Sequence, residues 1–182
     1  MPDPIHVSKP HKGRYDAVDV RKLAVTGMFV AIGVLSAHLV YIPVGVSKCF
    51  PVQAAVNILL AVLLGTRYAV SAAFVTSVLR NVLGTGSLLA FPGSMFGAAL
   101  AGFLFQRTQS IFGAIAGEVF GTGILGSLAS YPVARYLIGS KVGALFFVVP
   151  FLLSAAGGAV VAFFLCQMPF MAYLREQLQR KA

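Results

Sequence analysis

The sequence predicts an all-α membrane protein, a bundle of six transmembrane helices with both termini on the cytoplasmic side. Of its 182 residues, 58% are hydrophobic and only 10% are charged, whereas soluble domains average about 25% charged residues. A membrane-spanning helix needs about 20 apolar residues, so the chain has room for about six crossings. Little chain is left for a soluble catalytic or nucleotide-binding domain.

Six apolar runs account for the expected helices, which are separated by short segments rich in glycine, proline or charge. The expected helices cover residues 23–42, 52–64, 68–83, 93–105, 111–137 and about 142–168. The first run has the length of a spanning helix. The second is short, about 20 Å long at a helical rise of about 1.5 Å per residue.

The connections between these runs follow from their residues. Residues 43–51 form an outer loop bracketed by prolines, and Gly65-Thr66-Arg67 is a tight inner turn. The outer loop at 84–92 holds two glycines and a proline but is apolar, so we expect it either to touch lipid or to cover another part of the protein. The polar break at 106–110 reverses the chain, because one uninterrupted helix here would be about 65 Å long, roughly twice the bilayer core.

The basic residues set the expected orientation, since Lys and Arg concentrate on the cytoplasmic side of a membrane. The inner side would hold ten of the 14 basic residues: Lys9, Lys12, Arg14, Arg21, Lys22, Arg67, Arg107, Arg175, Arg180 and Lys181. The outer candidates are Lys48, Arg80, Arg135 and Lys141. We therefore expect a cytoplasmic tail at 1–20, a membrane domain at 21–175 and a second tail at 176–182. We attribute the net charge of +9 to the orientation of the chain in the membrane and not to binding of a nucleic acid.

Glycines recur at helical spacing in the fifth run. Gly113, Gly117 and Gly121 are four residues apart and share one helix face. Small residues at this spacing let two helix backbones approach closely within lipid. The pattern predicts a compact bundle.

Polar side chains are few within the apolar runs, and most fall near the outer end of the expected helices. Such residues are costly in a membrane and usually face the bundle interior or a cavity. Gln53 and Asn57 lie one helical turn apart, as do Glu118 and Thr122. The clustering predicts an outward-facing pocket for a small polar or aromatic ligand. Its candidate residues are Phe50, Gln53, Asn57, Arg80, Asn81, Phe91, Ser94, Glu118, Thr122 and Tyr131.

These residues would have different roles in the pocket. Phe50, Phe91 or Tyr131 would stack on the ligand, and the amides and Ser94 would bind its polar atoms. Glu118 lies deeper and is the only acid in any run, so it would pair with Arg80 or order the network around the ligand.

Simpler roles remain open for single members of this set. Tyr131 also suits the aromatic belt of a membrane protein. Gln53 and Asn57 also suit hydrogen bonds between neighbouring helices.

Catalytic signatures are missing from the sequence. It contains no GxxxxGK[ST], HExxH or GxSxG motif. Its two cysteines, Cys49 and Cys166, have neither CxxC nor metal-site spacing, so we expect no metal site. The chain is also small for a transporter built from two repeats. A binding subunit that is no enzyme and borrows its energy from partners fits these features best.

Several stretches resemble the ThiW type of substrate-binding S component from energy-coupling factor (ECF) transporters. The resemblance is carried by residues 21–28, 48–53, 79–86, 90–94 and 117–123, and its most specific part is the RNVLGTG…AFPGS stretch. It covers about residues 21–175, nearly the whole expected membrane domain.

The resemblance implies a function and partners for this chain. ThiW-type proteins are assigned to the uptake of hydroxyethylthiazole, the thiazole moiety of thiamin. The resemblance further implies six helices, cytoplasmic termini, a location in the cell membrane and a pocket under the first and third loops. A transmembrane coupling subunit and two ATPase subunits would supply the energy, so ATP would be used by partners and no cofactor by this chain.

The resemblance also implies a docking motif on the first helix. The family carries AxxxA there, and the corresponding stretch of this chain begins with Gly27 and ends with Ala31. The small-xxx-small pattern suited to close helix packing is kept.

Three alternatives stay open at this point. The chain would be an S component for a different small vitamin, a small intramembrane enzyme with Glu118 as acid or base and Ser94 as nucleophile, or a structural membrane subunit. Ligand binding separates them, because only an S component predicts saturable binding of a vitamin or its precursor.

Overall fold

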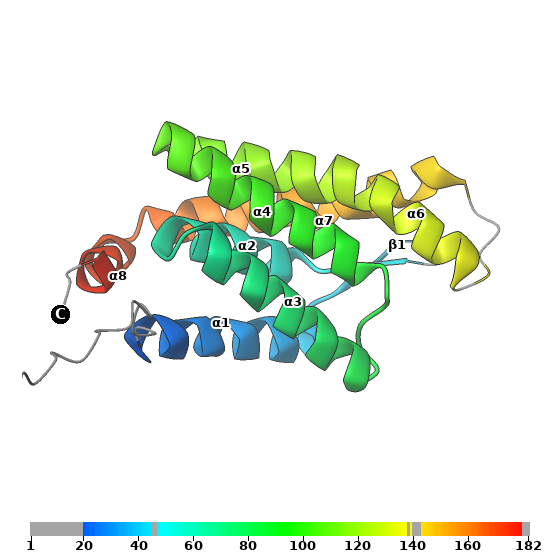
Figure 1. Ribbon diagram of the computed structural model, residues 1–182, viewed down its shortest axis with the longest axis horizontal. Helices are drawn as coiled ribbons and strands as arrows, with labels where there is room; N and C mark the ends of the chain where they lie inside the picture. The colour runs from blue at the N-terminus through cyan, green and yellow to red at the C-terminus, as the bar shows by residue number, and fades with distance from the viewer. Residues whose placement is uncertain (1–19, 45–46, 138, 140–142, 180–182) are drawn as a thin grey trace, which may run out of the picture.

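The computed structural model describes residues 20–44, 47–137, 139 and 143–179, and within them a bundle of helices with one short hairpin (Figure 1). The elements are α1 Val20–Leu39, β1 Ile42–Val44, β2 Ser47–Cys49, α2 Pro51–Leu63, α3 Thr66–Val82, α4 Ala90–Thr108, α5 Ile111–Phe120, the π-helix η1 Gly121–Gly126, α6 Ser127–Tyr136, the 3-10 turn η2 Ala144–Phe147, α7 Val148–Cys166 and α8 Pro169–Gln179. The expected tail at 1–20 lies outside the described residues except for Val20, where α1 begins.

The helices run roughly along one axis, with α1 on one side of the bundle and the α5–α6 segment on the other (Figure 1). Between them lies α2, which contacts α1, α3, α4, α5 and α7. Helix α8 sits at the end of the bundle where α1 begins. The hairpin and the connection between α3 and α4 lie toward the opposite end.

Helix α2 is the core of the molecule. Pro51 occupies its first turn, where a missing backbone N–H costs nothing. Eleven of its thirteen residues are buried, and all of its residues except Gln53 and Asn57 are apolar, as expected of a helix surrounded by others. Its shortness follows from this position, because a helix enclosed by protein need not match the thickness of the bilayer.

The interface between α4 and α5 confirms the close approach that the glycine spacing predicts. A Cβ atom added at Gly117 would lie 2.5 Å from the Leu100 carbonyl oxygen, and one at Gly121 would lie 2.6 Å from that of Phe96. Only glycine lets the two backbones meet at this distance. The small residues therefore bring the residues on α5 directly against α4.

The expected fifth helix at 111–137 is one helical segment from Ile111 to Tyr136. It begins at Ser110, whose hydroxyl accepts a hydrogen bond from the Phe112 backbone N–H at 3.3 Å. The segment passes through Pro132 and contains the π-helical stretch η1, which no sequence pattern indicates. Such stretches occur frequently at functional sites.

Three helical segments in the described chain are long and apolar enough to cross a membrane: Val20–Leu39, Ile111–Tyr136 and Leu145–Cys166. Helix α2 is apolar but shorter. The structure therefore supports a helical membrane protein, while the predicted number of six crossings is not decided by helix length and composition.

The C-terminal part of the described chain is helical. Helix α8 begins at Pro169 and continues past residue 175, the predicted boundary between the membrane domain and the tail. That boundary stays a prediction. The helix forms because Met171, Leu174 and Leu178 recur at helical spacing and pack against the core.

Two segments differ from the elements expected from the sequence. The loop at 43–51 contains an antiparallel pairing of β1 with β2. Helix α4 begins at Ala90 rather than at 93, because Pro92 lies in its first turn, where proline is tolerated.

Candidate functional site

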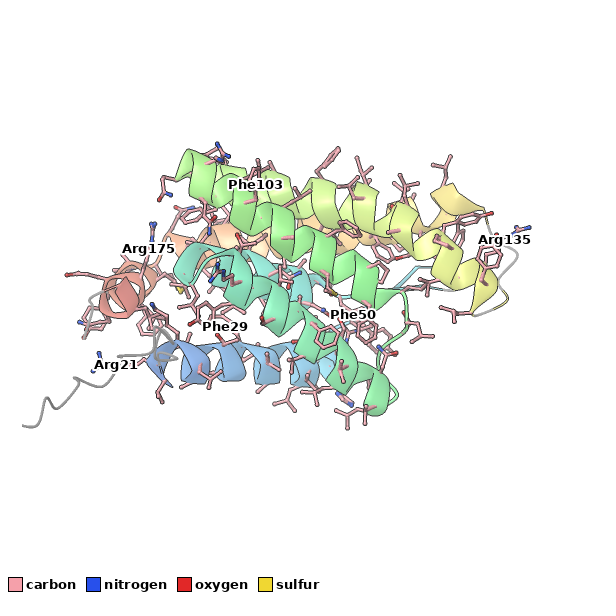
Figure 2. The ribbon with its side chains drawn as sticks, viewed as in Figure 1. Arg21, Phe29, Phe50, Phe103, Arg135 and Arg175 are labelled. Atoms are coloured by element: carbon pink, nitrogen blue, oxygen red, sulfur yellow. The ribbon has the colours of Figure 1, made fainter. Side chains whose placement is uncertain are left out.

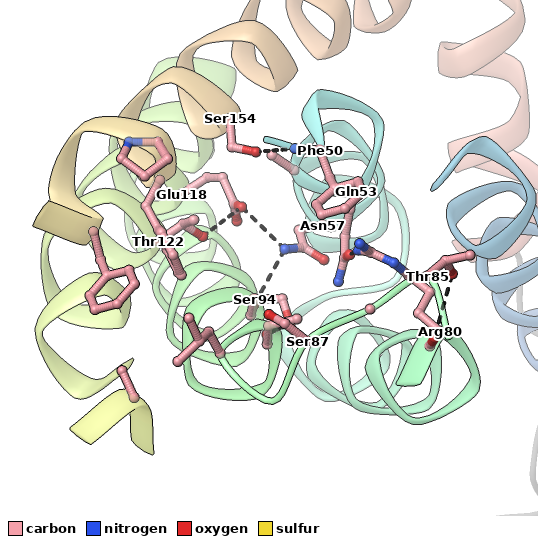
Figure 3. A pocket seen from close by; sticks show the side chains of 18 of the residues that line it. Phe50, Gln53, Asn57, Arg80, Thr85, Ser87, Ser94, Glu118, Thr122 and Ser154 are labelled. Carbon is pink, nitrogen blue, oxygen red and sulfur yellow. Dashed lines mark hydrogen bonds between the residues drawn. The ribbon is translucent and has the colours of Figure 1, made fainter. Parts of the chain in front are cut away.

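A cavity of about 630 Å³ lies between the helices, on the side of the bundle where α3 connects to α4. This volume is within the usual range for small-molecule sites, roughly 300–1,000 Å³. Seven of the predicted site residues line it: Phe50, Gln53, Asn57, Arg80, Ser94, Glu118 and Thr122. Figure 3 shows that they come from α2, α3, α4 and the α5–η1 segment and converge on one space.

Glu118 organises one end of the cavity. It is wholly buried, and its Oε1 atom accepts hydrogen bonds from Thr122 Oγ1 at 2.8 Å and from Asn57 Nδ2 at 3.1 Å. Its Oε2 atom has no hydrogen-bond partner in the described chain. One oxygen is thus held by two donors, and the other is left as a free acceptor.

Arg80 organises the other end. It is also wholly buried, and its Nη1 atom donates a hydrogen bond to Gln53 Oε1. Its guanidinium lies over the Phe50 ring, with Cζ 3.7 Å from the ring centroid, an attractive cation–π geometry. Arg80 Nε and Nη2 and Gln53 Nε2 have no hydrogen-bond partners in the described chain.

The suggested pair between Glu118 and Arg80 does not form in the part of the chain that the structure describes. Asn57 intervenes, and Figure 3 shows the two charged side chains on opposite sides of it. Asn57 Nδ2 donates to Glu118 and to the Ser94 carbonyl oxygen at 3.3 Å. Because both partners are acceptors, the amide nitrogen must face them, which leaves Asn57 Oδ1 facing away without a partner.

Ser94 lies beside the cavity and helps to hold α3 and α4 together. Its hydroxyl donates to the Ala90 carbonyl oxygen at 2.7 Å and lies 3.1 Å from the Ser77 hydroxyl. Both hydroxyls are engaged within α3 and α4, so they join these helices beside the cavity. Ser94 has no neighbouring base in this network, which leaves the nucleophile alternative without support.

Three predicted site residues do not line the cavity. Asn81 instead donates to the Ser77 and Ser87 carbonyl oxygens at 2.8 and 3.1 Å and braces the connection between α3 and α4. Phe91 packs against Phe74, with ring centroids 5.8 Å apart. Tyr131 is half-buried and accepts a hydrogen bond from exposed Arg135 at 3.4 Å. Helical spacing alone cannot tell which side of a helix its neighbours leave open.

Helix α7 contributes a wall that the sequence analysis missed. Phe147, Pro150, Phe151 and Ser154 line the cavity. The Ser154 hydroxyl accepts a hydrogen bond from the Phe50 backbone N–H. The one available signal was Ser154 itself, the single hydroxyl residue in an otherwise apolar helix.

Cys49 gives a second link between the hairpin and α7. Its thiol is fully buried and donates to the Pro150 carbonyl oxygen at 3.1 Å. Burial raises the pKa of the Cys49 thiol, which keeps it protonated as this bond requires. These contacts fix the hairpin and Phe50 against the wall of the cavity.

Residues 84–87 cover the cavity beside Arg80. The backbone N–H groups of Thr85 and Gly86 donate to the Arg80 carbonyl oxygen at 2.9 and 2.8 Å. Gly84 has a φ of +73°, a conformation that favours glycine. The expectation that this apolar loop covers something agrees with its place in the cavity lining.

The two predicted docking residues lie far from this network. Gly27 and Ala31 are both exposed on α1, and a Cβ at Gly27 would meet no atom within 4 Å. The buried face of α1 consists of other residues, among them Phe29, Val30 and Val34. Among the described residues, Gly27 and Ala31 therefore do not serve packing of α1 against the bundle.

Comparison with known proteins identifies the family. The family model described as thiamine-precursor transporter protein (ThiW) matches residues 23–169, which include every residue of the site described above. No curated protein and no solved structure matches the chain. Because the match covers most of the sequence, this chain belongs to the ThiW family of thiamine-precursor transporter proteins.

Proposed function

We propose that the chain is the membrane-embedded S component of an ECF uptake transporter and that its ligand is hydroxyethylthiazole. One observation carries the proposal. Eight buried side-chain atoms lack hydrogen-bond partners in the described chain, and five of them belong to Gln53, Asn57, Arg80 and Glu118. Unpaired buried polar atoms are costly, and their gathering around one cavity is the arrangement of a site completed by a polar ligand.

The proposed function assumes six crossings with both termini in the cytoplasm, and the position of the cavity agrees with that orientation. Arg21 and Arg175 lie at the same end of the bundle, and Arg135 lies at the other (Figure 2). With the Arg21 end in the cytoplasm, in keeping with the positive-inside rule, the cavity would face outward. A binding subunit for uptake needs that orientation to capture its ligand.

The exposed face of α1 supports a partner there. Gly27 and Ala31 leave a shallow, small-residue surface on which another transmembrane helix could pack closely. We assign this surface to the transmembrane coupling subunit. The coupling subunit and two ATPase subunits would then supply the energy, and this chain would bind the ligand in the cell membrane without any reaction of its own.

The test is a binding screen on the purified full chain in detergent or nanodiscs. Calorimetry should show saturable binding of hydroxyethylthiazole and much weaker binding of thiamin and of its pyrimidine precursor. Binding of a different vitamin alone would make the chain an S component for that vitamin. A lack of any saturable binding would instead indicate a structural subunit.

A transport assay tests the dependence on partners. Cells expressing this chain alone should bind radiolabelled hydroxyethylthiazole at their surface but should not accumulate it. Co-expression of a coupling subunit and its ATPases should produce ATP-dependent accumulation. Accumulation against a gradient without those subunits would contradict the proposal.

A further inference from the structure

The free polar atoms of the cavity are sorted by type into two ends. At the end formed by Gln53 on α2 and Arg80 on α3, the free atoms are donors: Nε and Nη2 of Arg80 and Nε2 of Gln53. Asn57, one turn further along α2, adds a free acceptor, its Oδ1 atom. The end formed by α5 and η1 offers an acceptor, Oε2 of Glu118. Figure 3 shows Asn57 between these two ends.

Hydrogen bonds between neighbouring side chains determine which atoms stay free at each end. Gln53 Oε1 is occupied by Arg80, so Gln53 must present its amide nitrogen to the cavity. Glu118 Oε1 is occupied by Thr122 and Asn57, so Oε2 is the oxygen that remains. At each end, a neighbouring side chain occupies one oxygen of the Gln53 amide or the Glu118 carboxyl, and the second polar atom of that amide or carboxyl stays free.

The space between the two ends has an apolar wall. Phe147, Pro150 and Phe151 line it from the α7 side. One face of Phe50 is covered by the Arg80 guanidinium, which leaves the α7 aromatics as the larger flat surface for a ring. A ligand that fits must carry an acceptor at one side of an aromatic ring and a donor at the other.

We infer that the cavity fixes the orientation of its ligand: the ring nitrogen of the thiazole accepts one hydrogen bond at the end where Arg80 and Gln53 present their donors, and the hydroxyl of its side arm donates to Glu118. The inference rests on the proposed function and adds a specificity to it. The free alcohol is bound and its phosphate ester is refused, because the wholly buried end at Glu118 offers, among the described residues, no cation to pair with a phosphate group.

Two ligand analogues and two variants test the orientation. The ethyl analogue of hydroxyethylthiazole lacks the hydroxyl, and the thiophene analogue lacks the ring nitrogen. Each should bind the unmodified chain roughly 10- to 100-fold more weakly than the natural ligand, since a hydrogen bond to a charged group is worth about that factor. In Arg80→Met the penalty for losing the ring nitrogen should shrink, because only the Gln53 donor remains at that end, while the penalty for losing the hydroxyl should be unchanged.

Glu118→Gln is the matched change at the other end. A glutamine side chain can keep an oxygen toward Asn57 and Thr122 and replace the free acceptor by a donor. The phosphate ester should bind the unmodified chain at least about 100-fold more weakly than the alcohol, and Glu118→Gln should narrow that gap at least tenfold. Gln53→Leu, which removes one donor without removing a charge, repeats the Arg80 test if Arg80→Met does not fold.

The control is Thr76→Val. Thr76 is buried on the same helix as Arg80, and its hydroxyl also lacks a hydrogen-bond partner in the described part of the chain, but it does not line the cavity. This variant should show the same analogue penalties as the unmodified chain.

The outcomes separate the two levels of the proposal. If the unmodified chain binds no thiazole compound, the proposed function fails. If it binds hydroxyethylthiazole but the penalty for losing the ring nitrogen disappears in Glu118→Gln and persists in Arg80→Met, the orientation is reversed and this inference is overturned. Tight binding of the phosphate ester by the unmodified chain would overturn it as well.

Discussion

Helices α1 and α2 are neighbours in the chain but differ in almost every respect. Helix α2 is buried on nearly all sides and presents Gln53 and Asn57 to the cavity. Helix α1 packs with one face only and exposes an apolar face that includes Gly27 and Ala31. If the proposed function holds, α2 serves ligand recognition and the exposed face of α1 serves partner contact, and we expect that either can change without the other.

The largest effect is expected where cavity residues depend on a close helix contact. In Gly97→Ala, the added Cβ would collide with Thr122 and Glu118. Overpacking of this kind costs about 1–3 kcal/mol, and here it displaces the group that holds the acceptor end of the site. We expect ligand affinity to fall more than about 100-fold, measured by calorimetry, together with a lower melting temperature.

Gly27→Ala is the matched control for that variant, because nothing lies within 4 Å of its new Cβ. It should keep full affinity and full uptake. If Gly97→Ala kept its affinity, the close contact between α4 and η1 would not position the site.

The independence of ligand binding and partner contact is tested by placing bulky side chains on the exposed face of α1. Gly27→Leu combined with Ala31→Leu should abolish uptake in cells that contain the coupling module, because bulky side chains prevent close helix packing. The dissociation constant of the purified chain should not change. Val160→Leu, at an exposed position of α7, is the control and should leave uptake intact. Loss of ligand binding in the double variant would show that α1 and the cavity are not independent.

The two asparagines form a finer comparison within the site. Asn57→Ala removes a donor to Glu118 and a free carbonyl in the cavity, so affinity should fall about 10- to 100-fold. Asn81→Ala only loosens the connection at 84–87 and should weaken binding by a few-fold through a faster dissociation rate. Equal losses in both variants, measured by stopped-flow fluorescence or filter binding, would place Asn81 in contact with the ligand.

The smallest effect is expected outside both regions. Thr76 Oγ1 is buried at the contact between α1 and α3 and has no hydrogen-bond partner among the residues that the structure describes. Thr76→Val keeps the shape and removes the unpaired hydroxyl, so the melting temperature should stay equal or rise slightly. Ligand affinity should be unchanged. A marked drop in stability would reveal a hydrogen bond at this position.

The site shows how many cavity-lining residues can be predicted from helical spacing. Seven of ten predicted residues line the cavity because polar groups in an apolar helix turn away from lipid. Asn81, Phe91 and Tyr131 lie on helices that also carry cavity residues or their neighbours, but the packing of the chain turns them elsewhere. The wall from α7 was missed because its aromatic residues are indistinguishable in sequence from those that face lipid.

The sequence by itself determined the class of protein, the approximate helix boundaries and the family, because each follows from local composition, period and motif. The tertiary structure alone decided that, in the described chain, Arg80 and Glu118 lie on opposite sides of Asn57 without pairing, since that depends on how α3 and α5 pack against α2. It also decided that Gly27 and Ala31 are exposed while Gly33, on the same helix, packs against Thr76. A period of about 3.6 residues places side chains on faces, but only the packing of the neighbouring helices determines what each face meets.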